Sequence, residues 1–261
     1  IAGVNPKRAT LRSVAFPRFA VQVDLQYEFD AREIPDDWNT GYVPQGASEP
    51  GQYPKILYGT EVYELNNDLR AKILDCARRV DLDDSEAASN YRARYAGAPG
   101  DVFNLGAMKP SVVDGDVASA NVFFHGHLLG QAVEEFVDLI TNGRGSYSMT
   151  QQEDNATLGA LLRSTLQGRA DFSRIIIMRA GSNFDRSIND TKRPAIPLHV
   201  NHGGLNPSLE NLYRVGRVVV KEIIDGWEPT YREGIKPTNY IGDIFGALGG
   251  TPDFGPGMER A

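Results

Sequence analysis

The sequence predicts an α/β fold with a mainly parallel sheet, and three observations lead to this prediction. Residues 19–29 alternate strictly between apolar and polar side chains, which is the period of a β-strand. Residues 174–180 contain a continuous run of Ile and Met, as strands do when both faces of a parallel sheet are covered. Between residues 111 and 224, strand-like and helix-like patterns alternate, and this order is typical of sheets whose strands are joined by helices.

The first half of the chain divides into four predicted segments. Residues 19–29 form a strand, and residues 30–58, rich in Pro, Gly, Asp and Tyr, form a long loop. Residues 60–80 carry apolar side chains at helical spacing and predict a helix. Residues 81–110 are polar and irregular, so we expect no regular element there.

The second half predicts elements that alternate. Gly143 ends a helix predicted over residues 128–140, because glycine tolerates the left-handed backbone that stops helices. Asn206 and Pro207 begin a helix predicted over residues 206–224. Beyond residue 234 the chain is rich in Gly and Pro and is expected to pack as coil. We expect short strands at residues 111–114 and 121–124, helices over 128–140, 156–166 and 206–224, a strand over 146–150, and a central strand over 174–180 that leads into a turn at 181–185.

Composition limits the class of protein and its partners. The chain has 261 residues, of which 41% are hydrophobic and 23% charged, as in ordinary globular proteins. A net charge of -7 argues against nucleic acid as the main partner, because phosphate binding requires a basic face. The single cysteine, Cys76, excludes an intramolecular disulfide and falls in a helical pattern, where we expect it to be packed. No apolar run reaches the roughly 20 residues that a membrane span requires.

The start of the sequence is unusual, because Ile1 to Pro6 carries no methionine and no helix cap. We therefore expect an N-terminal portion upstream of this chain, with residues 1–261 forming a single domain. The pair Ala2-Gly3 could let backbone amides approach an anion, although two small residues are a weak signal.

Glu153 lies between a predicted strand and the helix that begins near residue 156. Ligands in open α/β sheets bind at the carboxyl ends of strands, so this position suits a binding residue. An ionised carboxylate only accepts hydrogen bonds and therefore matches two neighbouring sugar hydroxyls. The alternative is that Glu153 or Asp154 caps the helix and interacts with its dipole. Asn155, directly after them, is a further candidate for substrate binding.

The segment from Gly181 to Arg186 follows the next predicted strand, so we expect it to share a pocket with Glu153. Ser182 and Asn183 are candidate substrate-binding residues, because an amide offers both a donor and an acceptor to the edge of a heterocyclic base. Asp185 could donate a proton if burial raised its pKa. The alternative is an Asp185–Arg186 ion pair in a surface turn.

The four histidines are grouped in two pairs, at residues 125 and 127 and at residues 199 and 202. His-x-His can bind zinc, but no third ligand stands out, so we expect no metal site. His125 and His202 are candidate pocket residues.

Several blocks resemble the purine nucleoside permease family of fungi and bacteria. They are residues 150–157 (TQQEDNAT), 179–186 (RAGSNFDR), 203–213 (GGLNPSLENLY), 234–243 (GIKPTNYIGD) and 1–10. The family is distantly similar to nucleoside phosphorylases, and this resemblance implies a three-layer α/β/α sandwich with a mainly parallel mixed sheet. It also implies that Glu153 binds the ribose hydroxyls and that Ser182 and Asn183 contact the purine.

Three positions depart from the family's usual pattern. Asn121 and Asn183 stand where Asp is common, and Ser187 stands where Pro is usual. An amide at residue 183 cannot give a proton to a leaving base and can only hydrogen-bond to it. Two acidic positions have thus become neutral.

The resemblance implies an enzyme that cleaves the N-glycosidic bond of a purine nucleoside with phosphate or water. Asn183 and Asp185 are the candidate catalytic residues, phosphate is a candidate co-substrate, and no metal or organic cofactor is expected. A homo-oligomer is expected by analogy with phosphorylases. Two alternatives stay open: a biosynthetic isomerase or cyclase acting on another small molecule, and a nucleoside-binding or transport protein without catalysis.

Overall fold

The computed structural model describes residues 2–188 and 203–256, and their strands form one nine-stranded mixed sheet and a separate hairpin. The order across the sheet is β11-β6-β3-β8-β9-β1-β10-β2-β7. Its strands are β1 (Ala2–Val4), β2 (Val14–Ala15), β3 (Phe19–Gln22), β6 (Val62–Glu64), β7 (Val112–Val113), β8 (Asp116–Ser119), β9 (Tyr147–Gln151), β10 (Arg179–Phe184) and β11 (Gly242–Asp243). The hairpin pairs β4 (Gln26–Glu28) with β5 (Tyr42–Pro44).

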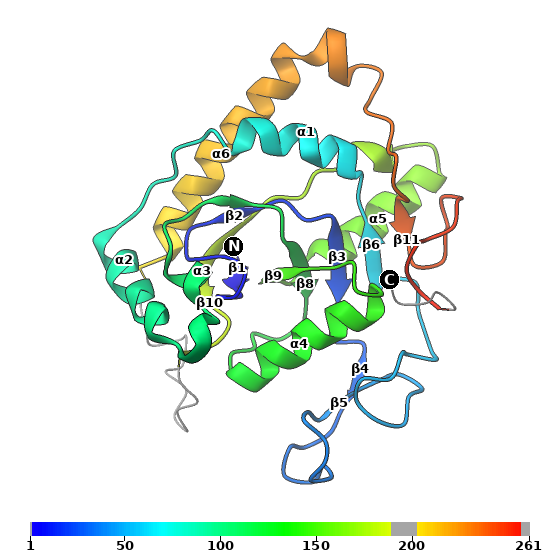
Figure 1. Ribbon diagram of the computed structural model, residues 1–261. Helices are drawn as coiled ribbons and strands as arrows, with labels where there is room; N and C mark the ends of the chain where they lie inside the picture. The colour runs from blue at the N-terminus through cyan, green and yellow to red at the C-terminus, as the bar shows by residue number, and fades with distance from the viewer. Residues whose placement is uncertain (1, 189–202, 257–261) are drawn as a thin grey trace.

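Helices pack around this sheet, with α1 and α6 above the strands and α4 below them in Figure 1. The α-helices are α1 (Asn67–Ala77), α2 (Glu86–Ala93), α3 (Asn104–Ala107), α4 (His127–Ile140), α5 (Asp154–Leu166) and α6 (Leu205–Asp225). Short 3-10 turns are η1 (Arg94–Gly97), η2 (Pro99–Asp101) and η3 (Phe172–Arg174), and a π-turn, η4 (Trp227–Tyr231), follows α6.

Alternating side chains of the central strands face different layers of helices. Val21 of β3 shares a hydrophobic cluster with Val137 of α4, whereas its neighbour Ala20 shares another with Leu158 of α5. Because successive strand residues point to opposite faces, α4 and α5 must cover opposite sides of the sheet. A third cluster joins α1 and α6 to β2, β7 and β10. The predicted three-layer α/β/α arrangement is therefore confirmed.

Three regions of the first half differ from the sequence-based expectation. The alternating stretch 19–29 is two strands, because the chain leaves the sheet after Gln22 and β4 pairs with β5 instead. The predicted helix 60–80 begins as strand β6 and becomes helical only after Asn66, whose side chain accepts hydrogen bonds from the amides of Asp68 and Leu69. The irregular stretch 81–110 contains α2, α3 and two 3-10 turns.

Two predicted strands of the second half are displaced along the chain. The strand expected at 121–124 lies earlier, as β8, and residues 121–126 form the connection to α4. The apolar run 174–180 divides its side chains between two clusters, Ile175 and Ile177 in one and Ile176 and Met178 in the other. The paired strand β10 begins only at Arg179, so Ser182 and Asn183 lie within a strand and not in a turn.

Candidate functional site

Glu153 stands at the start of α5, directly after β9. It occupies the N-cap position, but its side chain makes no capping hydrogen bond and is 66% exposed. The helix amides are satisfied by other residues: Oε1 of Gln151 accepts from the amide of Asp154 at 2.7 Å, and Oγ of Ser119 from that of Asn155 at 3.4 Å. The expected alternative was that Glu153 or Asp154 caps the helix. Glu153 stands at the N-cap position without a side-chain capping bond, the Asp154 carboxylate binds Arg179 instead, and the Glu153 carboxylate stays exposed.

Arg179 ties the start of β10 to α5. Its guanidinium binds both carboxylate oxygens of the buried Asp154, with a distance of 3.1 Å from Nε to Oδ2. Its Nη1 lies 3.6 Å from Oε2 of Glu153, which is longer than a hydrogen bond. Burial raises the pKa of Asp154, and the bonds to Arg179 oppose this rise. Arg179 therefore hydrogen-bonds to Asp154 and makes only a longer ionic contact with Glu153.

The side chain of Asn155, predicted to bind substrate, is buried and fully used by neighbouring segments. Its Nδ2 donates to the carbonyls of Thr60 at 2.7 Å and Ala20 at 3.3 Å, and its Oδ1 accepts from Oγ of Ser119 at 2.5 Å. One amide thus joins β3, the entry to β6 and β8 beneath the start of α5. Asn155 contributes to the shape of this region, and its substrate-binding role stays a prediction.

Asn183 lies in a half-buried position of β10 beside Gly3 of β1. A register shift between β1 and β10 pairs Gly3 with Asn183 and leaves Ser182 as the extra residue. A Cβ at residue 3 would lie 2.7 Å from Oγ1 of Thr150, so glycine is needed for Thr150 to stand this close, while Nδ2 of Asn183 would be in ordinary contact at 3.8 Å. The amide of Gly3 donates to Oγ1 of Thr150 at 3.0 Å and is therefore not available to an anion.

His125 and Ser182 surround Asn183. Oγ of Ser182 donates to Oδ1 of Asn183 at 2.9 Å. Nδ1 of His125 lies 3.1 Å from the carbonyl oxygen of Phe184, which also accepts from Nδ2 of Asn183 at 3.4 Å. The structure therefore brings three of the predicted site residues together: Ser182 is bonded to Asn183, and Asn183 and His125 share the carbonyl of Phe184. His202 lies outside the described residues.

The hydrogen bond of His125 assigns its tautomer. A carbonyl oxygen only accepts, so Nδ1 carries the proton and Nε2 of the neutral ring keeps a lone pair. Burial lowers the pKa of His125, which favours the neutral ring. Nε2 is buried and has no hydrogen-bond partner within residues 2–188 and 203–256. The ring thus keeps an unsatisfied acceptor at Nε2.

Asp185, predicted as a catalytic acid, belongs to a buried ionic network. Both of its oxygens accept from Arg186 at 2.8 Å, and Oδ2 also accepts from the hydroxyl of Tyr147 at 2.8 Å. Arg186 lies 3.1 Å from Glu134, which also binds Lys7 at 2.8 Å. Burial raises the pKa of Asp185 and the contact with Arg186 opposes it. The alternative of an Asp–Arg pair is what the structure shows, although the pair is buried and not at the surface.

The strand directions contradict the expectation that Glu153 and Asn183 follow neighbouring parallel strands. β1 pairs antiparallel with β9 and parallel with β10, so β9 and β10 run in opposite directions. The end of β9 therefore lies beside the start of β10, where Glu153 approaches Arg179. Asn183 is four residues further along β10, about 13 Å away at the usual rise per residue. Its role and that of Glu153 stay predictions.

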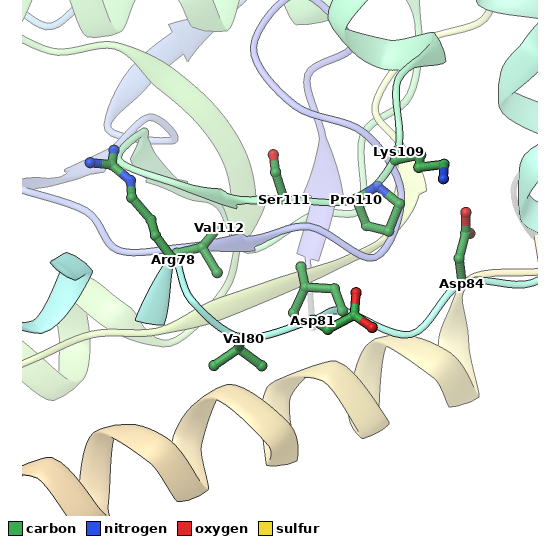
Figure 2. A pocket seen from close by; sticks show the side chains of 9 residues that line it. Arg78, Val80, Asp81, Asp84, Lys109, Pro110, Ser111 and Val112 are labelled. Atoms are coloured by element: carbon green, nitrogen blue, oxygen red, sulfur yellow. The ribbon is translucent and has the colours of Figure 1, made fainter. Parts of the chain in front are cut away.

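A hollow of about 390 Å³ also lies beside the edge strand β7. In Figure 2 Arg78 points away from it on one side, while Lys109 and Asp84 stand at the other end. Asp84 is bound to Arg12 and Arg92, and Arg78 to Asp114 at 3.4 Å. Because two of its four charged groups, Arg78 and Asp84, already have partners and no predicted site residue lines it, we do not place the ligand there. Among the described residues there is no group of three His, Cys, Asp or Glu placed to hold a metal ion.

A family model for purine nucleoside permease matches residues 1–236. The chain belongs to the purine nucleoside permease family. It is 37% identical over 263 residues to a purine nucleoside permease of Candida albicans, covering 98% of this chain and 63% of that protein. A probable purine nucleoside permease of Schizosaccharomyces pombe is 35% identical over 237 residues, covering 87% of this chain and 66% of that protein. The chain thus spans less than two thirds of the length of these relatives.

Solved structures with a similar fold include two bacterial enzymes. A 5'-methylthioadenosine/S-adenosylhomocysteine nucleosidase of Neisseria meningitidis aligns with a TM-score of 0.40 and 14% identity, over 85% of this chain and 66% of the other. A futalosine hydrolase of Helicobacter pylori aligns with a TM-score of 0.39 and 14% identity, over 85% of this chain and 65% of the other.

Within the described residues, no helix combines the length and the apolar composition needed to cross a bilayer.

Proposed function

We propose that this protein binds a purine nucleoside and cleaves its N-glycosidic bond. The observation that carries the nucleoside ligand is the family match over residues 1–236, since that range contains every candidate site residue. Cleavage is our inference from the chemistry of those residues. The arrangement of His125, Ser182 and Asn183 adds a polar cluster suited to one end of such a ligand.

The base would bind at this cluster. Asn183 offers an amide that can both donate and accept, and Ser182 holds its oxygen in place. Neutral His125 adds the lone pair of Nε2 as an acceptor for an N–H of the base. These groups would recognise a heterocycle by its pattern of donors and acceptors.

Glu153 would hold the sugar. Its carboxylate is largely exposed, and its 3.6 Å contact with Arg179 leaves both oxygens able to accept from a pair of hydroxyls. Glu153 and Asn183 would bind opposite ends of the ligand: Glu153 lies 3.6 Å from Arg179 at the start of β10, and Asn183 is four residues further along that strand, about 13 Å from Arg179. A nucleoside is elongated and has its hydroxyls and its base edge at opposite ends, which suits this arrangement.

Cleavage places positive charge on the sugar and negative charge on the departing base. A carboxylate near the sugar stabilises the first, and an amide donor at the base stabilises the second. Water or phosphate would complete the reaction as the acceptor of the sugar, and the proposal requires no further cofactor. The acid role of Asp185 stays a prediction, because its oxygens face Arg186 and Tyr147.

Nucleoside binding without cleavage is the second candidate. It is favoured by the state of the two candidate catalytic residues: Asn183 has no acidic proton, and Asp185 is held in a buried ion pair. Both candidates require the same binding groups and differ only in whether the bond breaks.

The test is incubation with inosine or adenosine, with and without phosphate, followed by chromatography of the free base and the sugar product. Free base that requires phosphate indicates phosphorolysis, and free base without phosphate indicates hydrolysis. Glu153→Ala and Asn183→Ala should each lower turnover at least tenfold. Glu210→Ala is the matched control, because Glu210 is also an exposed carboxylate paired with an arginine, Arg214.

The outcomes separate the candidates. Saturable nucleoside binding without base release would support the binding protein. Neither binding nor release would exclude both and favour the isomerase or cyclase alternative. Full turnover in Glu153→Ala would exclude the role assigned to that residue.

A further inference from the structure

A separate cavity of about 330 Å³ opens where β3 and β8 end against the first turns of α5. These strands are parallel, and their register places Gln22 opposite Ser119, so both strands end at the same edge of the sheet. The carboxyl ends of parallel strands are a common place for ligands. The cavity is lined by Gln22, Asp24, Thr60, Ser119, Ala120, Asn121, Gln152, Asn155, Ala156, Gly159 and Arg163. Asn155 is among these residues, with its amide already bonded to Thr60, Ala20 and Ser119, whereas Glu153, Ser182 and Asn183 are not.

Asp24 gives this cavity an unsatisfied acceptor. Its Oδ2 accepts from the amide of Asn121 at 2.9 Å. Its Oδ1 is buried and finds no hydrogen-bond donor in the described part of the chain. A buried polar atom without a partner carries a free-energy cost, which a donor bound in the cavity would remove. Because Asp24 lines the cavity, a molecule bound there is placed to supply this donor.

The other polar groups of the lining are mostly neutral. Oε1 of Gln22 accepts from the hydroxyl of Thr60 at 2.9 Å, which directs the amide nitrogen of Gln22 to other partners. Asn121, just after β8, and Gln152, just after β9, add side-chain amides to the lining. The exposed Arg163 of α5 adds a positive charge. Amides and a carboxylate together can donate to and accept from the same hydroxyl groups.

The apolar part of the lining offers no surface on which an aromatic ring could stack. It consists of Ala120, Ala156 and Gly159, so no aromatic or large aliphatic side chain of the lining is available for a ring to stack on. A volume of about 330 Å³ corresponds to roughly ten water molecules at ~30 Å³ each, which sets the size of an occupant. The occupant is therefore compact, polar and rich in hydroxyls.

We propose that this cavity binds a polyhydroxylated molecule of monosaccharide size, with Oδ1 of Asp24 accepting from its hydroxyls. Gln22 and Asn121 supply amides to the remaining hydroxyls, and Arg163 closes the side formed by α5. This site goes beyond the nucleoside site proposed above, since the lining does not include Glu153 or Asn183, and it holds whether or not the protein cleaves nucleosides.

The test is binding of D-ribose and D-xylose to the whole chain, measured by saturation-transfer NMR and by titration calorimetry. Asp24→Asn removes the anionic acceptor at constant shape, and Ala156→Leu fills the cavity from an exposed helix position. We expect each to raise the Kd at least tenfold. Ala160→Leu is the matched control, because Ala160 is exposed on the same helix but does not line the cavity, and it should leave the Kd unchanged.

Three outcomes would overturn the proposal. The first is no measurable pentose binding to the parent chain. The second is pentose binding that Ala156→Leu leaves intact while circular dichroism shows a folded variant. The third is preferential binding of glycine or serine, which would identify Asp24 and Arg163 as a site for a zwitterion. Asn183→Ala separates the two sites: pentose binding should survive in it even if nucleoside turnover is lost, and loss of pentose binding would contradict the assignment to this cavity.

Discussion

Asp185→Asn tests whether the buried network at the end of β10 supports the fold. Asp185 and Arg186 are both fully buried, and the carboxylate accepts from Arg186 at 2.8 Å through both oxygens. Asparagine keeps the shape but is neutral, and its amide nitrogen faces the donors of Arg186. The guanidinium would retain Glu134, at 3.1 Å, as its remaining anionic partner.

Breaking one partner of a buried ion pair typically costs about 3–5 kcal/mol. The hydroxyl of Tyr147 can reorient towards the new amide, so we expect a cost near the lower end, about 3 kcal/mol. For a chain of this size each kcal/mol corresponds to roughly 2–4 °C in Tm, so the melting temperature should fall by roughly 10 °C. Urea unfolding followed by circular dichroism gives the free energy, and calorimetry gives the Tm.

Asp225→Asn is the control, because Asp225 forms an exposed pair with Lys221 and should change stability by less than about 0.5 kcal/mol. Equal stability of Asp185→Asn and Asp225→Asn would refute the argument for the buried network. Turnover measured below the melting temperature of the variant addresses the other role. A catalytic acid at residue 185 would appear as a loss of roughly 10²–10⁴-fold in rate in folded protein.

Two further predictions concern buried polar groups near the start of α5 and on β6. Burial raises the pKa of Glu64 to about 7, against the opposing effect of Arg18. Between pH 4.5 and 7 the folded state therefore holds a proton that the unfolded state releases, so the free energy of unfolding should fall by about 3 kcal/mol as pH rises through this range. Glu64→Gln should remove this pH dependence in urea titrations. An unchanged pH dependence in the variant would contradict the assignment to Glu64. Asn155→Ala should cost about 2–3 kcal/mol, because the carbonyls of Thr60 and Ala20 lose their donor; a loss below about 0.5 kcal/mol in thermal melts would show that water replaces the amide.

Elements whose signals are local could be predicted closely. Helices α4, α5 and α6 and strand β9 fall within a few residues of their expected positions, because amphipathic spacing and stop residues are read along one segment. Gly143 has the expected left-handed backbone, with φ of 81°. Cys76 is buried, as its place in a helical pattern predicted.

The misplaced elements depended on partners that lie far away in the sequence. Residues 60–66 have helical spacing, yet β6 pairs with β3 and β11, which begin about 40 residues before it and 180 residues after it. The run 174–180 looks like a central strand, but hydrogen bonding to β1 starts only at residue 181. Among the site residues, the roles of Gln151 as helix cap and Thr150 as partner of Gly3 went unpredicted. The block from residue 150 to 157 contained both, but their partners were not visible in it.

The amino-acid sequence alone determined the α/β class, the family, and the strand and helix on either side of Glu153, since periodicity, caps and short motifs act within a few turns of chain. It placed Asn183 in a turn, whereas the structure has it within β10. Only the tertiary structure decided how those elements face each other. β1 lies between β9 and β10 and runs antiparallel to β9 and parallel to β10, so β9 and β10 end in opposite directions. Burial likewise decided that Asp185 belongs to Arg186 and Tyr147, because the cost of an unpaired buried charge is set by the groups that surround it in space and not by its neighbours in sequence.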